Sequence, residues 1–142
     1  MNKIIIKKEI IDKILQHFDS FSFEMGGALI SKDNRIVDFI PLQNIEENKK
    51  DNYLFSFEQL NMVLSPYFNK GYDLAGFIHS HIGGCLSLSK NDKVFFSNFL
   101  KENSSYKHLI TPIIVLSDKN KEIKWWMFFA NGDVEELLPL IK

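Results

Sequence analysis

The chain has 142 residues, of which 45% are hydrophobic and 25% charged, a composition typical of one soluble globular domain. Seventeen basic against eighteen acidic residues give a net charge of −1 without a basic block, which argues against nucleic acid as a partner. The single cysteine, Cys85, excludes a disulfide framework and cysteine-rich zinc modules. No stretch has the length and apolarity of a signal peptide or membrane span, so we expect a cytoplasmic protein without a membrane partner.

The hydrophobic pattern predicts strands and helices that alternate along the chain. The first half is expected to contain a strand at Lys3–Ile6, a helix over Lys7–Phe18, a break at Asp19–Ser22, and strands at Glu24–Ser31 and Arg35–Pro41 around a polar turn at residues 32–34. The second half is expected to contain a polar loop at Gln43–Tyr53, a helix from Phe57 that ends before Asn69, a left-handed exit at Gly71, a strand at Asp73–His79, a helix opened by Ser89, and strands at Leu109–Leu116 and Ile123–Ala130 around a turn at Ser117–Lys121. This order predicts a single α/β domain over residues 1–142, with a mixed sheet flanked by helices.

Two of the four histidines, His79 and His81, lie one residue apart at the end of a predicted strand. Because side chains alternate along a strand, both imidazoles should point to the same face, close enough to share one metal ion. Asp92 is the candidate third ligand, since a glycine-containing loop can fold the first turn of the next helix back against the strand end. Two nitrogens and one carboxylate oxygen leave the fourth tetrahedral position open, which is typical of a catalytic zinc site.

A water bound to such a metal needs a general base, and Glu24 is the candidate. It lies at the start of an apolar strand, where burial of a carboxylate without a partner is costly. If this strand end neighbours that of His79, Glu24 can take a proton from the water and pass it to a leaving amine.

The pattern His-x-His, seven residues, Ser, two residues, Asp, with a Glu far upstream, resembles the motif of the JAMM (JAB/MPN+) zinc metalloproteases. It is present here as Glu24, His79, His81, Ser89 and Asp92. Three further segments resemble strands of the family: Glu24–Ile30, Ile40–Asn44 and Gly76–His81. The resemblance covers about Ile4 to Ala130 and favours the compact prokaryotic Prok-JAB type, because the chain has no room for the second insertion of eukaryotic deubiquitinases.

The resemblance implies a JAB/MPN domain, a mixed sheet between helices similar to the cytidine-deaminase architecture. It implies that His79, His81 and Asp92 hold Zn²⁺, that Glu24 is the general base and acid, and that Ser89 hydrogen-bonds the oxyanion. It also implies cleavage of peptide or isopeptide bonds after the C-terminal glycines of a ubiquitin-like protein. Compact members of the family commonly accompany relatives of ubiquitin-activating and ubiquitin-conjugating enzymes in bacterial conjugation and phage-defence operons.

Simpler interpretations exist for each part of the motif. Ser89 to Asp92 is also a helix-capping sequence, which is compatible with metal binding because capping would orient Asp92. Glu24 alone would most often be a surface acid at a strand end. Cys85 beside a histidine suggests a thiol protease, but no obvious Asn or Asp would orient the imidazole.

Three other functions differ from the peptidase in the residues or the substrate that they require. A non-catalytic MPN-type scaffold usually lacks the ligands that this chain retains. A peptidase acting on an unrelated peptide remains an alternative. A zinc deaminase is excluded, because its Pro-Cys-x-x-Cys motif needs more than one cysteine.

Two features bear on how substrate is held. The proline that commonly follows His-x-His in the family is Ile82 here, before Gly83 and Gly84, so we expect a more mobile loop. Gln43–Phe55 is the loop long enough to offer a substrate an edge, and Tyr53–Phe57 is expected to extend like a strand.

Overall fold

A computed structural model describes residues 4–19, 23–50, 52–117 and 120–142. The three helices are α1 (Lys8–His17), α2 (Phe57–Asn69) and α3 (Lys90–Glu102). The strands are β1 (Ile5–Ile6), β2 (Gly26–Lys32), β3 (Arg35–Leu42), β4 (Asp73–His81), β5 (His108–Ile110), β6 (Ile113–Leu116), β7 (Lys121–Lys124), β8 (Trp126–Phe129), β9 (Val134–Glu136) and β10 (Leu140–Ile141). None of the helices in the described ranges is long and apolar enough to cross a membrane.

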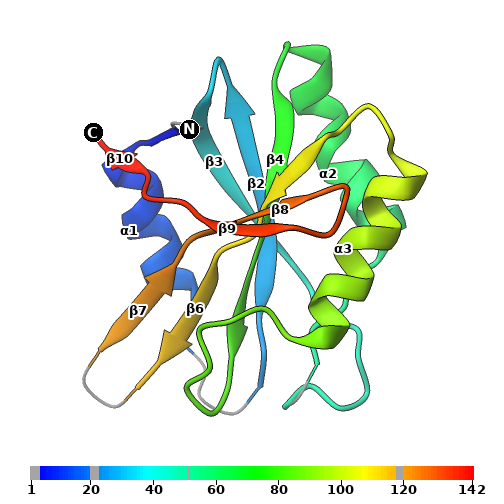
Figure 1. The fold of residues 1–142 in the computed structure, drawn as a ribbon. Coiled ribbons are helices and arrows are strands. Elements are labelled where there is room, and N and C mark those ends of the chain that lie inside the picture. The colour runs from blue at the N-terminus through cyan, green and yellow to red at the C-terminus, as the bar shows by residue number, and fades with distance from the viewer. Residues whose placement is uncertain (1–3, 20–22, 51, 118–119) are drawn as a thin grey trace.

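The strands form one mixed sheet that divides after β4. One path runs in the order β10-β1-β3-β2-β4-β5-β8-β9, while β6 pairs with β4 and β7. The antiparallel β2–β3 and β2–β4 pairs form the centre, and β1 joins β3 and β10 in parallel. The sheet therefore brings the two ends of the described chain side by side, as Figure 1 shows.

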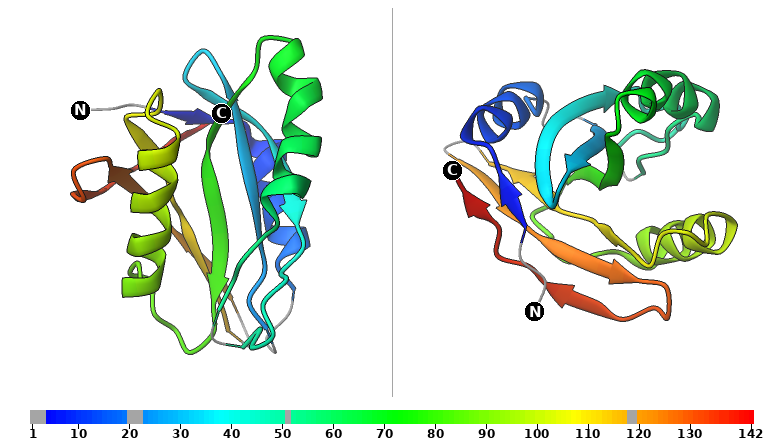
Figure 2. Two further views of the ribbon diagram at one scale, coloured as in Figure 1. Left: turned by 90° about the vertical axis from the view of Figure 1, so that its right-hand side faces the viewer. Right: turned by 90° about the horizontal axis from the view of Figure 1, so that it is seen from above.

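Helices cover both faces of the curled sheet (Figures 1 and 2). Residues of α2 and α3 pack on one face with Phe77, and residues of α1 pack on the other with Ile78. Side chains at neighbouring positions of β4 thus pack into different hydrophobic cores, because successive side chains of a strand point to opposite faces of the sheet. His79 and His81 share the face of Phe77, the face that α2 and α3 cover.

Gly76 lets β4 and β5 approach each other closely. A Cβ atom at this position would lie 1.8 Å from the carbonyl oxygen of Ile110, its partner in the parallel pair. Any other residue would have to move the backbone. The glycine thereby places the β5–β6 segment directly beside the strand that carries the two histidines.

The predicted α/β class, with a mixed sheet flanked by helices, is confirmed. The hairpin at residues 32–34 is also confirmed, because Asp33 and Asn34 have φ values of 53° and 62°, as a tight two-residue hairpin turn requires. Gly71 takes the expected left-handed conformation, with φ of 84°.

Several predicted boundaries are wrong. The run Leu109–Leu116 forms two strands, because Pro112 has no N–H to donate to a neighbouring strand. The run Ile123–Ala130 is also divided, since β7 ends before Trp125 and β8 begins after it. The strands β9 and β10 were not expected. Tyr53–Phe57 does not extend as a strand, since Ser56 caps α2 and Phe57 begins it. The breaks and turns predicted at Asp19–Ser22 and Ser117–Lys121 lie partly outside the described residues.

Candidate metal centre

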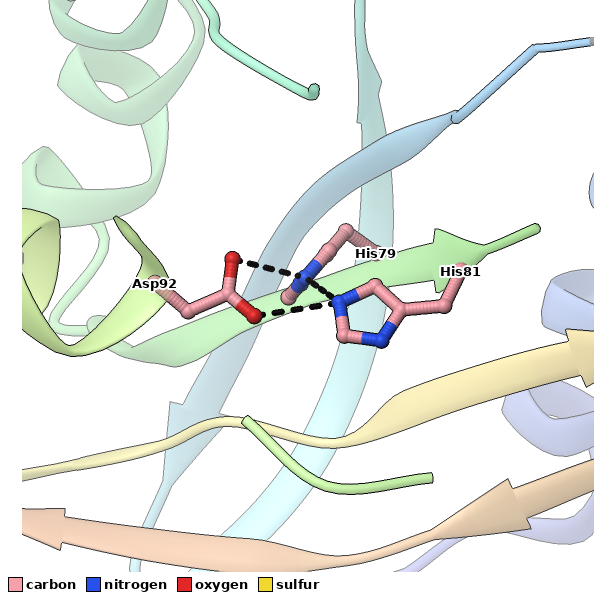
Figure 3. A group of neighbouring side chains, drawn as sticks. All are labelled: His79, His81 and Asp92. Carbon is pink, nitrogen blue, oxygen red and sulfur yellow. Dashed lines mark hydrogen bonds and ion pairs between the residues drawn. The ribbon is translucent and has the colours of Figure 1, made fainter. Parts of the chain in front are cut away.

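Three side chains from two elements converge at one end of the sheet. His79 and His81 lie at the end of β4, and Asp92 lies in the first turn of α3 (Figure 3). The two Nε2 atoms are 2.9 Å apart. Asp92 Oδ1 lies 3.2 Å from His79 Nε2, and its Oδ2 lies 3.0 Å from His81 Nε2. The His-x-His spacing on a strand thus brings both imidazoles to one carboxylate.

The loop after β4 sets the orientation of His81. Its Nδ1 lies 2.9 Å from the backbone carbonyl of Cys85. Because a carbonyl only accepts, Nδ1 carries a proton there, so that Nε2 has a lone pair available for a metal ion whenever the ring is neutral. Gly83 and Gly84 make this contact possible, since φ values of 99° and 87° turn the chain back toward the strand.

The start of α3 fixes Asp92. Ser89 caps the helix through its Oγ, which accepts from the Asp92 N–H at 3.0 Å, while the Ser89 N–H donates to Asp92 Oδ2 at 2.8 Å. This reciprocal capping box, foreseen from the sequence, holds the carboxylate against the histidines. Capping and a role at the centre are therefore compatible.

The cluster is strongly coupled electrostatically. Burial by itself would raise the pKa of Asp92, but hydrogen bonds from His79 and His81 hold it well below its usual range. Burial also opposes charge on His81, yet the Asp92 carboxylate raises the pKa of His81 to about 8. Without a cation, a proton on His81 compensates the buried carboxylate.

The donor set fits a divalent metal ion. Ligand atoms around a tetrahedral zinc lie about 3.3 Å apart, given bonds of about 2.0–2.1 Å. The atoms here are separated by 2.9–3.2 Å, so a small adjustment would admit an ion. His79, His81 and Asp92 could hold a metal, and two imidazoles with one carboxylate are a common catalytic zinc set.

The structure places Glu24 in the wall of the same cavity as the three side chains. Only 6% of this residue is exposed, and its negative charge contributes to raising the pKa of His81. Its backbone is held on both sides, since its N–H donates to the Lys49 carbonyl and its carbonyl accepts from Asn44 Nδ2 at 2.9 Å. Glu24 is therefore a buried, positioned acid.

Strand pairing brings Glu24 close to the histidines. Gly26 stands opposite His79 in the β2–β4 ladder. Ser80, the residue between the histidines, accepts a hydrogen bond at its Oγ from the Met25 N–H at 2.8 Å. The two contacts fix the register of the two strand ends.

Tyr53 forms a wall over His79. The two rings are stacked with centroids 6.2 Å apart, and the Tyr53 hydroxyl donates to the Leu42 carbonyl at 2.9 Å. Gly26 leaves room for this ring, because a Cβ there would lie 2.5 Å from it. The resulting cavity has a volume of about 220 Å³, with Phe55 and Phe95 among its apolar walls.

The sequence alone indicated no role for Asn44 or Ser80 at this site, and it placed Tyr53 only in the segment expected to offer substrate an edge. Asn44 and Ser80 lie in two segments that resemble strands of the family, Ile40–Asn44 and Gly76–His81, and this resemblance could have indicated them. Tyr53 had no such signal, because its position depends on how the polar loop folds over the sheet.

Cys85 does not form a nucleophile–histidine pair. Its thiol contacts the Ser87 carbonyl at 3.7 Å, while His81 uses Nδ1 for the Cys85 carbonyl and Nε2 for Asp92. Both nitrogens of this imidazole are therefore engaged elsewhere. The thiol-protease alternative has no support in this geometry.

Two solved structures share the architecture. The solution structure of protein DSY2949 from Desulfitobacterium hafniense superposes with a TM-score of 0.75 at 19% identity, covering 98% of this chain and 92% of that one. The crystal structure of AF2198, a JAB1/MPN domain protein from Archaeoglobus fulgidus, superposes with a TM-score of 0.60 at 17% identity and full coverage of both chains. The fold is that of a JAB1/MPN domain.

The MPN likeness concerns the fold alone at these identities. No protein-family profile matches the sequence, and no curated protein matches it.

Proposed function

We propose that this protein is a zinc-dependent peptidase or isopeptidase of the JAMM family, in its compact prokaryotic form. The observation that carries the proposal is the convergence of His79, His81 and Asp92 in a cavity that Glu24 also lines. A scaffold has no use for three converging ligand atoms beside a buried acid. The three side chains would hold Zn²⁺, which supplies Lewis-acid polarisation of a carbonyl and activation of water.

The remaining groups have separate tasks in hydrolysis. Glu24, held by its backbone at the cavity wall, accepts a proton from the attacking water and delivers it to the leaving amine. Ser89 Oγ accepts the Asp92 N–H, so its own proton remains able to donate toward a developing oxyanion. The Cys85 carbonyl keeps His81 in the tautomer that presents Nε2.

The shape of the cavity supports a substrate with small residues at the cleaved bond. At about 220 Å³, with Tyr53, Phe55 and Phe95 in its walls, the cavity offers little space for a side chain near the ligands. A terminal Gly-Gly of a ubiquitin-like protein meets this requirement, because glycine adds no side chain. We propose deconjugation or precursor processing of such a protein.

The proposed partners follow from this substrate. They are the ubiquitin-like protein or its conjugates, with relatives of ubiquitin-activating and ubiquitin-conjugating enzymes, in a bacterial conjugation or antiviral system in the cytoplasm. A peptidase acting on an unrelated peptide with small residues is the alternative.

The test combines metal content with cleavage. Purified protein should contain one zinc per chain, and His81→Ala should lose most of it. Ubiquitin-like fusions ending in Gly-Gly should be cleaved, matched fusions with Val in place of Gly should not, and chelation should stop the reaction while alkylation of Cys85 does not.

Two results would contradict the proposal. Equal zinc in the parent protein and His81→Ala would remove the ligand assignment. Cleavage abolished by alkylation but not by chelation would indicate thiol chemistry instead.

A further inference from the structure

A second cavity lies at the opposite end of the sheet from the metal centre. Its volume is about 580 Å³, and its walls include the cations Lys7, Lys32, Arg35 and Lys70 with the rings of Tyr67 and Tyr72. We call this cavity, which Asp33 and Asp38 also line, the basic cavity. Since β2 runs from Gly26, opposite His79, to Lys32, a rise of about 3.3 Å per residue separates the two sites by roughly 20 Å.

Two of the cations face each other across a tight hairpin. Lys32 and Arg35 are paired residues of the β2–β3 ladder, joined by the turn at Asp33 and Asn34. Like charges directly opposite each other on neighbouring strands are destabilising. An anion bound between them would remove this repulsion. Arg35 is also the only arginine in the sequence, and its planar fork suits phosphate and carboxylate oxygens.

The acids of the basic cavity do little to neutralise its cations. Asp38 accepts hydrogen bonds from Lys13, which lies outside the cavity, and from the Tyr67 hydroxyl. Asp33 stands in the hairpin turn. Within the described ranges, none of the four cations forms an ion pair, and Lys32 instead lies 5.0 Å from the ring centroid of Tyr72.

The surrounding strands favour a compact ligand over an extended peptide. At the hairpin, β2 pairs with β3 and β4, and β3 pairs with β2 and β1. Among the described residues, Ser31 and Arg35 next to the turn are thus paired on both sides, which leaves little free strand edge at the turn for a peptide backbone. The cations come from three separate parts of the chain and converge on one cavity, which suits a small ligand with several charges.

We propose that the basic cavity binds a compact ligand carrying phosphate groups, with Lys32 and Arg35 as its principal contacts. Free oligophosphate and the phosphates of a nucleotide share this chemistry. In the second case, the base or sugar would contact Tyr67 and Tyr72.

Calorimetric titration with sodium pyrophosphate and with ATP, at physiological ionic strength, tests the proposal. Both probes should bind, and each should raise the melting temperature. Arg35→Gln should weaken binding about tenfold or more, as expected for loss of charge-assisted hydrogen bonds. Lys101→Gln, which removes the same charge from an exposed position on α3, should change it less than about twofold.

Further variants separate this site from the metal centre and from folding defects. His81→Ala should bind pyrophosphate as the parent does. Should Arg35→Gln fail to fold, Lys32→Gln provides the same test from the other strand. Equal affinities for pyrophosphate and ATP would show that only the phosphates are recognised. If ATP binds more tightly and Tyr72→Leu abolishes the difference, the base or sugar of ATP contacts the Tyr72 ring.

Three outcomes would overturn the proposal. The first is the absence of binding by both probes. The second is unchanged affinity in both Arg35→Gln and Lys32→Gln. The third is loss of binding in His81→Ala, which would place the phosphate at the metal centre.

Discussion

The side-chain amide of Asn44 donates to the backbone carbonyl of Glu24 at 2.9 Å. The same Nδ2 donates to the Asn52 carbonyl, and Oδ1 accepts from the backbone N–H groups of Glu46 and Leu54. One buried side chain thus joins the strand end that carries the candidate base to the polar loop that crosses the cavity. Asn44 is therefore a positioning residue for Glu24.

Asn44→Ala should destabilise the protein and reduce turnover together. Four backbone groups lose their partner, at about 1–3 kcal/mol for each group left buried and unsatisfied, so we expect a loss of several kcal/mol at most. Chemical denaturation and steady-state kinetics measure the two effects. Asn98→Ala, at an exposed position on α3, is the matched control and should change neither.

Asn44→Asp refines this prediction, because it keeps the two accepting contacts and removes both donors. Because its second carboxylate oxygen would face the Glu24 and Asn52 carbonyls without a proton to donate, kcat should fall together with stability. A variant in which stability falls while kcat is unchanged would assign Asn44 a purely structural role.

Glu24→Gln should keep the fold and the metal but lose hydrolysis. Glutamine has the same shape and can bond to water, yet it cannot accept a proton, and loss of a general base costs about 10²- to 10⁴-fold in rate. Elemental analysis and single-turnover assays measure the two properties. Near-normal turnover in this variant would reduce Glu24 to a buried strand-end acid.

Ser89→Ala separates the capping function from an oxyanion contact. Loss of the cap should cost about 1 kcal/mol of stability, although the Ser89 N–H still holds Asp92 in the variant. Loss of an oxyanion donor should in addition lower kcat by about 10²- to 10³-fold. If unfolding shows the stability loss while kcat is unchanged, Ser89 serves only as a cap.

The two histidines and Asp92 could be predicted to meet because the signal was local. Side-chain alternation along β4 and the cap at the start of α3 are both properties of short segments. The position of Glu24 beside the histidines could be predicted only if the two strand ends were neighbours, because that position depends on the β2–β4 register. That register comes from pairing between residues far apart in sequence, such as Gly26 and His79.

The predicted strand boundaries are wrong where contacts between distant parts of the chain determine which residues form a strand. Pro112 was visible in the apolar run Leu109–Leu116, but its effect depended on the direction in which each half paired. The short β10 forms only against β1, at the other end of the chain.

The segment Tyr53–Phe57 does not offer substrate a free backbone edge at Leu54. Leu54 lies in this segment, which was expected to offer substrate a backbone edge, but its N–H already donates to Asn44 Oδ1 at 3.3 Å. Leu54→Pro would therefore disturb the Asn44 contacts and cannot report on substrate binding alone.

The last prediction concerns the pH dependence of stability in metal-free protein. The raised pKa of His81, about 8 against an unfolded value of 6.5, means that its stabilisation is complete below pH 6.5 and is lost as pH rises through 8. The lowered pKa of Asp92 contributes stability that is lost only as pH falls below its ordinary range. The melting temperature of chelator-treated protein should therefore fall between pH 6.5 and pH 8.5.

His17 cannot cause this decrease in melting temperature. Burial lowers the pKa of His17, so its contribution to stability changes in the opposite direction with pH, mainly below pH 6.5. The variant His81→Asn should abolish most of the decrease. Zinc requires the neutral imidazole, so the gap in melting temperature between zinc-loaded and metal-free protein should widen over the same interval. A metal-free melting temperature with the same slope in the parent protein and His81→Asn would show that the His81–Asp92 pair does not govern this transition.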